Sequence, residues 1–144
     1  MINLVKTTAV LIILLMSISI SQVTAGAHKH SKESADLMAM HHMRLMINHA
    51  VEMAAQGSNL IMLGQMDMAK GIDGISMKHG KIMIEDAKAL MKEVMTGETM
   101  MEMHKHGGSP DVSSEMAYTH RLGAAAMTYI DLVERMSTAQ KHDK

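Results

Sequence analysis

The amino-acid sequence predicts an all-α protein, an antiparallel four-helix bundle, and two observations lead to this prediction. Apolar side chains recur every three or four residues over long stretches, which is the spacing of one face of a helix. Strands would require sustained alternation of apolar and polar residues and β-branched clusters between turns, and the sequence shows neither. Turn signals divide the chain into segments with short connections, as in an antiparallel bundle.

The first two helices are expected on either side of a glycine. One covers residues 33–56, and the run Gly57-Ser58-Asn59 breaks or bends it. A shorter helix then reaches Lys70. If the first helix instead passes straight through Gly57, the protein is a three-helix hairpin with one long helix, and this alternative stays open.

The remaining helices follow clearer turn signals. A turn at residues 71–74 precedes a third helix over residues 75–95, and its continuation to residue 104 is left open. Residues 107–111 (Gly-Gly-Ser-Pro-Asp) form the clearest loop of the chain. Pro110 suits the first position of a final helix that extends to about residue 139.

The N-terminus has the pattern of a secretory signal peptide over residues 1–25. Lys6 supplies the positive charge, an apolar run follows, and small residues allow cleavage after Ala25 or Ala27. The apolar run is short for a membrane span, so we expect export to the periplasm or secretion without stable membrane insertion; an uncleaved anchor is the alternative. The mature chain would comprise a flexible His-containing arm (26–32), the helical bundle (33–139) and a polar tail (140–144).

The composition is biased towards two uncharged metal ligands. The chain has 20 methionines and 10 histidines, with no cysteine, phenylalanine or tryptophan. Lack of cysteine excludes disulfides, thiolate metal sites, thiol nucleophiles and covalently attached haem. A net charge of −1 offers no basic surface for nucleic acid. Thioethers suit Cu(I) and imidazoles suit Cu(I), Cu(II), Zn and Ni, so the bias points to copper.

Methionine and histidine share helical faces, because residues three or four apart are neighbours on a helix. We expect these faces to point inward, since apolar stripes form cores, and to hold Cu(I) between helices. The expected ligands are Met38, His42, Met46, His49 and Met53, flanked by His41 and Met43, then His79 and Met83, and finally Met116, His120 and Met127. Each methionine alone is more simply a core residue, and Met62, Met91, Met95 and Met136 are assigned to the core only.

Two further groups complete the predicted ligands. Residues 100–106 lie near a helix end and are expected to be exposed, so the methionines there have less reason to serve as core. Met101, Met103, His104 and His106 are candidates for a patch that captures metal ions, and a hydrophobic tip covered by the first loop is the alternative. In the N-terminal arm, His28 or His30 becomes residue three after cleavage, a position that allows square-planar binding of Cu(II).

Enzyme functions find no support. The sequence lacks Glu-x-x-His, His-Glu-x-x-His, glycine-rich phosphate loops and nucleophile elbows, so we expect no catalytic residues. Two other functions stay open: a methionine-rich scavenger of oxidants and an interaction module with a methionine-lined groove. Non-covalent haem is a distant third, because only Tyr118 and Tyr129 offer aromatic packing.

The Met-x-x-His and His-x-x-Met repeats, the signal peptide and the lack of cysteine resemble periplasmic Met/His-rich proteins of bacterial copper and silver resistance. Residues 38–49 (Met-Ala-Met-His-His-Met-Arg-Leu-Met-Ile-Asn-His) also resemble the first helix of small ferritin-like, four-helix copper-tolerance domains. The likeness is one of motifs, strongest over residues 38–53. It implies metal sequestration outside the cytoplasm; unlike the silver-binding relatives, which are largely disordered without metal, this chain has enough apolar periodicity to fold alone.

The combined prediction is a periplasmic protein that sequesters, stores or hands on Cu(I), with Ag(I) as a further candidate ion. A copper exporter or a copper enzyme in the same compartment are the candidate partners. The sequence leaves the number of ions and the oligomeric state open.

Overall fold

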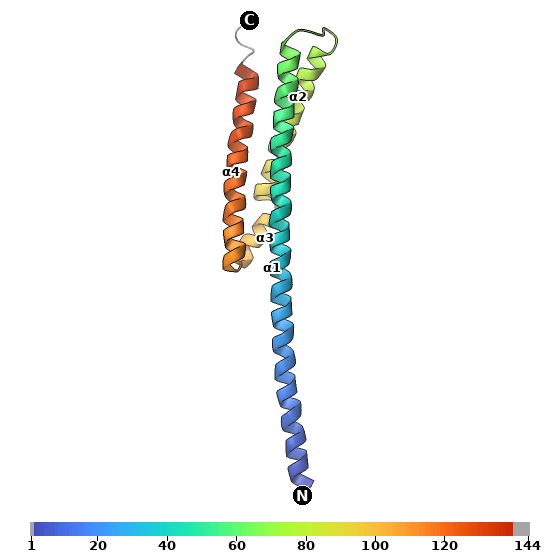
Figure 1. Ribbon diagram of the computed structural model, residues 1–144, viewed down its shortest axis with the longest axis vertical. Helices are drawn as coiled ribbons and strands as arrows, with labels where there is room; N and C mark the ends of the chain where they lie inside the picture. Colours follow the sequence, from blue (N-terminus) through green and yellow to red (C-terminus); the bar gives the residue numbers. More distant parts are fainter. Residues whose placement is uncertain (1, 140–144) are drawn as a thin grey trace. The chain divides into compact units, whose positions relative to one another are not determined.

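The computed structural model describes the backbone of residues 2–139 and the side chains of residues 31–105 and 107–139. Within this part the chain forms α1 (Ile2–Gln65), α2 (Asp73–Thr96), α3 (Glu98–His106) and α4 (Pro110–Ala139), and no strand (Figure 1). The predicted all-α class is therefore confirmed. The four-helix bundle is not, because three of these helices are long and α3 has only nine residues.

The long α1 accounts for the difference from a four-helix bundle. The run that starts at Gly57 predicts a break or a bend, yet the helix continues through it to Gln65, as in the alternative with one long helix. A glycine inside a helix costs about 1 kcal/mol relative to alanine, so packing must offset that cost. Gly57 lies against Gly80 of α2, and a Cβ atom on Gly57 would stand 2.5 Å from the Gly80 carbonyl oxygen. The missing side chain thus allows α1 and α2 to cross closely.

The chain divides into two compact units, residues 1–36 and residues 37–144. The first unit is the N-terminal part of α1, which includes the expected arm at residues 26–32. No helix in the described part of the chain combines the length and apolar character needed to cross a membrane. Cleavage of a signal peptide stays a prediction, and the polar tail at residues 140–144 lies outside the described residues.

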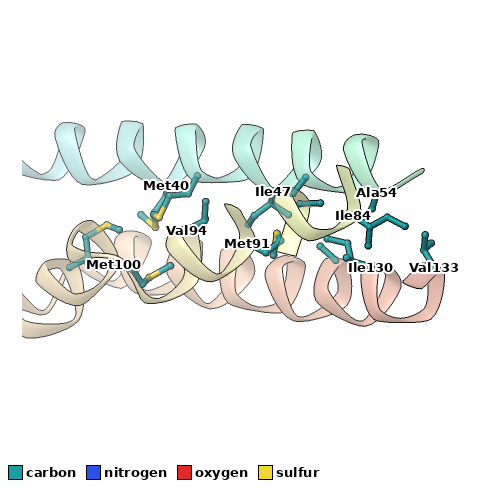
Figure 2. Close-up of a cluster of buried hydrophobic side chains, with 14 of the residues drawn as sticks. Met40, Ile47, Ala54, Ile84, Met91, Val94, Met100, Ile130 and Val133 are labelled. Carbon is teal, nitrogen blue, oxygen red and sulfur yellow. The ribbon is translucent and has the colours of Figure 1, made fainter. Parts of the chain in front are cut away.

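The core of the second unit follows a heptad pattern on its three long helices. In α1 the buried positions alternate in steps of three and four, which is the seam of a coiled coil. α2 and α4 repeat the spacing, and side chains from all three helices meet in Figure 2. The seam residues are Met40, Met43, Ile47, Ala50, Ala54, Gly57, Ile61 and Gly64 of α1; Gly80, Ile84, Ala87, Met91 and Val94 of α2; and Thr119, Gly123, Ala126, Ile130, Val133 and Ser137 of α4.

Ionic contacts tie the same helices together at the edge of this core. Arg44 of α1 pairs with Glu115, donates from Nε to the Thr119 hydroxyl at 3.0 Å, and lies 5.0 Å from the Tyr118 ring centroid. Lys88 of α2 contacts Glu134 of α4 at 2.7 Å. These contacts join α4 to both α1 and α2 at the edge of the core.

The turn between α3 and α4 has the local chemistry that the sequence predicts. Gly107 adopts a φ of +55°, a region that favours glycine, and so reverses the chain after α3. Ser109 accepts a bond from the Val112 N–H at 3.4 Å through its hydroxyl, and Pro110 is the first residue of α4. This turn brings the end of α3 beside the first half of α4.

Candidate metal centre

The expected inner stripe of α1 lies at the edge of the core, with Met46 and Met53 packed against the core and its histidines in solvent. His42 and His49 are exposed, and Met46 and Met53 are only half-buried. Each stands one residue before a seam residue, which on a helix of 3.6 residues per turn is a rotation of about 100°. The seam uses their neighbours Met43, Ile47, Ala50 and Ala54. The prediction that the histidines of this stripe face the interior is therefore wrong.

The same displacement occurs on α2. His79 is exposed and Met83 is half-buried, whereas the seam passes through Gly80 and Ile84, the residues that follow them. The expectation of an inner ligand pair on α2 is wrong for His79 in the same way. The ligand stripes are thus real helical faces, but those of α1 and α2 lie beside the core, and their histidines face solvent.

The other predicted ligands fall into three environments. Met43 and Met103 are core residues, Met116 and Met127 are half-buried against the core, and Met38, His41 and Met101 are exposed. The side chains of His28, His30 and His106 lie outside the described residues. Of the methionines assigned to the core only, Met91 is fully buried and Met95 is half-buried, whereas Met62 and Met136 are exposed, which contradicts that assignment.

One pair of predicted ligands does converge. The Nε2 atoms of His104 in α3 and His120 in α4 lie 3.2 Å apart, and the two rings meet edge to face with centroids separated by 5.0 Å. His104 is exposed and His120 is half-buried, so the space between the nitrogens is open to solvent. These two residues are 16 positions apart and come together through the Gly107 turn.

A backbone carbonyl determines which nitrogen of His104 is free. Its Nδ1 lies 2.8 Å from the carbonyl oxygen of Met100, one turn earlier in α3. A carbonyl only accepts, so Nδ1 carries the proton, and the neutral ring has its lone pair on Nε2, the atom aimed at His120. In metalloproteins the ligating histidine usually donates its second N–H to such a carbonyl or to a carboxylate.

The separation of the two nitrogens suits a shared ion. Metal–imidazole bonds of about 2.0–2.1 Å, as known for zinc, would place an ion between two nitrogens 3.2 Å apart at an N–metal–N angle of roughly 100°. This angle is close to tetrahedral and leaves positions for further ligands. Without an ion, the same distance fits a hydrogen bond in which the His120 N–H donates to Nε2 of His104.

A methionine precedes each histidine of the pair by about one helical turn. Met101 precedes His104 by three residues and Met116 precedes His120 by four, so each shares a helical face with its histidine. A third sulfur comes from α2: Met95 Sδ occupies the space over Gly123, one turn after His120. Among the described side chains, no group of three or more histidine, aspartate or glutamate residues is placed to hold a metal ion. Methionine thioethers are not included in that statement.

Sequence reasoning found both histidines but not their pairing. It placed His104 in an exposed capture patch and His120 in an inner stripe, and it left Met95 out of the ligand set. One signal was available: the spacing Met-x-x-x-His occurs at Met100/His104 and again at Met116/His120, on either side of the glycine turn.

No protein-family model, curated protein or solved structure matches the chain.

Proposed function

We propose that this protein binds Cu(I) between His104 and His120, with one or more neighbouring thioethers completing the coordination, in order to sequester, store or hand on copper in the periplasm. The single observation that carries the proposal is the 3.2 Å approach of two imidazole Nε2 atoms. Two neutral imidazoles and a thioether form a soft, uncharged ligand set, which favours Cu(I) over Mg²⁺, Ca²⁺ or Mn²⁺.

The exposure of the pair supports exchange of the ion. A ligand such as His104 that faces solvent can pass an ion to a partner's ligands without unfolding of the helices. Met116, the half-buried neighbour of His120, is the first choice for the third ligand, because its sulfur is held near the core and needs less ordering than the exposed Met101.

The test is an anaerobic Cu(I) titration against a chromogenic competitor, with Zn(II) and Ni(II) titrated in parallel. His104→Gln or His120→Gln should each weaken Cu(I) binding by at least about tenfold. Loss of a group that only hydrogen-bonds to a ligand already costs about tenfold or more in metal affinity, and each imidazole here is a direct ligand. The matched control is His79→Gln, an exposed histidine outside the pair, which should leave the affinity unchanged. Equal losses in all three variants, or none in any, would refute the assignment.

A second function is favoured by a different observation, the exposure of many methionines. Met38, Met66, Met68 and Met136 are each at least 60% exposed, and exposed thioethers react with oxidants to form reversible sulfoxides. We therefore keep oxidant scavenging as the alternative. If the protein scavenges oxidants, it should protect a second enzyme from hypochlorite equally well after both His104 and His120 are replaced by glutamine. Protection no better than that given by the same concentration of free methionine would refute this function.

A further inference from the structure

Three exposed methionines gather where α1 ends and the chain turns into α2. Met62 is 50% exposed, Met66 is 60% exposed and Met68 is 80% exposed, although all three fall within seven residues. The core of the protein takes its methionines from other positions, such as Met40 and Met91. The three at the turn therefore need a reason other than packing within this chain.

The backbone brings these residues to one place. Met62 belongs to the last turn of α1, and the Met66 N–H donates to the Leu63 carbonyl at 3.2 Å, so the chain still coils when it reaches Met66. Met62 and Met66, four residues apart, consequently share a face. Asp67 then adopts a φ of +53°, which reverses the chain so that Met68 follows directly after the reversal.

Hydrogen bonds hold the turn in this form. The Ala69 N–H donates to Asp73 Oδ2 at 2.9 Å, and the Ile72 N–H donates to the Ala69 carbonyl at 2.8 Å. These bonds close the backbone of residues 69–73, directly after Met68, while the side chains of Met62, Met66 and Met68 are exposed to solvent. The carboxylate of Asp67, exposed between Met66 and Met68, adds negative charge at the same place.

We propose that Met62, Met66 and Met68 form a second metal site, an all-thioether site for a soft monovalent cation, Cu(I) or Ag(I). Each of the three sulfurs is carried by its own flexible side chain and can move to fit such an ion. The ion accepts soft ligands and needs no fixed geometry. Asp67 offsets the single positive charge without being a required ligand. The site shares with the proposed His104–His120 centre only the class of ion, and it binds whether or not that centre does.

The test uses Ag(I), which is stable in air, and protein labelled with ¹³C at the methionine methyl groups. On addition of Ag(I), the methyl resonances of Met62, Met66 and Met68 should shift together and stop shifting after one equivalent has bound to them. The same three shifts should appear in the His104→Gln/His120→Gln variant, so that failure of the histidine centre and failure of this site are told apart.

Substitution by leucine provides the second measurement, because leucine preserves volume and apolar character. The Met62→Leu/Met66→Leu/Met68→Leu variant should bind one Ag(I) fewer than the unchanged protein. The matched control is Met136→Leu, which removes one exposed methionine of α4 and should keep the full stoichiometry. An unchanged stoichiometry in the triple variant, or methyl resonances that shift independently without saturation, would overturn the proposal and leave the turn as an apolar surface for a protein partner.

Discussion

Replacing Gly80 by alanine should destabilise the protein, although alanine is the better helix former. Gly80 lies in the seam of α2 where it crosses α1 at Gly57. An added Cβ would meet the Gly57 carbonyl oxygen and would stand 2.8 Å from Ile61 Cγ1 and 3.1 Å from the Ile61 nitrogen. Two of these neighbours are backbone atoms, which cannot rotate away as a side chain does, so the helices must separate.

The net effect is the difference between two opposing terms. Alanine gains up to about 1 kcal/mol of helix propensity over glycine. Overpacking of a filled interior costs about 1–3 kcal/mol, and here the upper half applies because backbone atoms must move. The free energy of unfolding should therefore fall by about 1–2 kcal/mol, which lowers the melting temperature by several degrees.

Urea unfolding followed by circular dichroism at 222 nm measures this change, provided that the transition is two-state. The matched control is Gly74→Ala in the first turn of α2, where an added Cβ has no neighbour within 4 Å. That substitution should stabilise the protein by up to about 1 kcal/mol. If Gly80→Ala stabilises the protein as much as Gly74→Ala does, the close crossing of α1 and α2 is wrong.

Two further predictions concern the core and the edge of α2. Met91 is fully buried, so Met91→Ala should lower the free energy of unfolding, measured in urea, by about 2–5 kcal/mol. The volume-conserving Met91→Leu should lower it by less than about 1.5 kcal/mol. Similar losses in both variants would argue against a packed interior at this position. The pKa of Lys88 is raised above the ordinary value, chiefly by the hydrogen bond to Glu134. The charged lysine therefore stabilises the folded protein. This stabilisation is fully present below the ordinary lysine pKa of about 10.4 and is lost as the pH rises through the raised pKa. The side chain of Lys88 is 37% exposed, so solvent screening limits that contribution to less than about 1 kcal/mol. Comparing Lys88→Met with the unchanged protein at about pH 8 and about pH 11 should show a difference in unfolding free energy that is smaller at the higher pH. A constant difference would exclude the charge as its source.

The candidate metal site was predicted in its parts rather than as a whole. His104 and His120 were both expected ligands from the identity of their side chains and their nearby methionines. Their convergence depends on the angle between α3 and α4, which the Gly107 turn sets and which no local spacing encodes. The role of the Met100 carbonyl in directing Nε2 of His104 likewise depends on a rotamer that only packing determines.

The sequence by itself determined the all-α class, the position of the last loop and the start of the last helix at Pro110, because helical periodicity, glycine and proline act through local backbone energetics. The loop was predicted over residues 107–111 and covers residues 107–109. Only the tertiary structure decided which face of each helix is buried. In α1, the Met/His stripe and the seam differ by one residue, and both are apolar enough to be a core on periodicity alone. The seam is the buried face because Ala50, Ala54 and Gly57 let a second helix approach closely. Small side chains favour burial of a face only when a partner helix packs against it, so local periodicity does not reveal the choice.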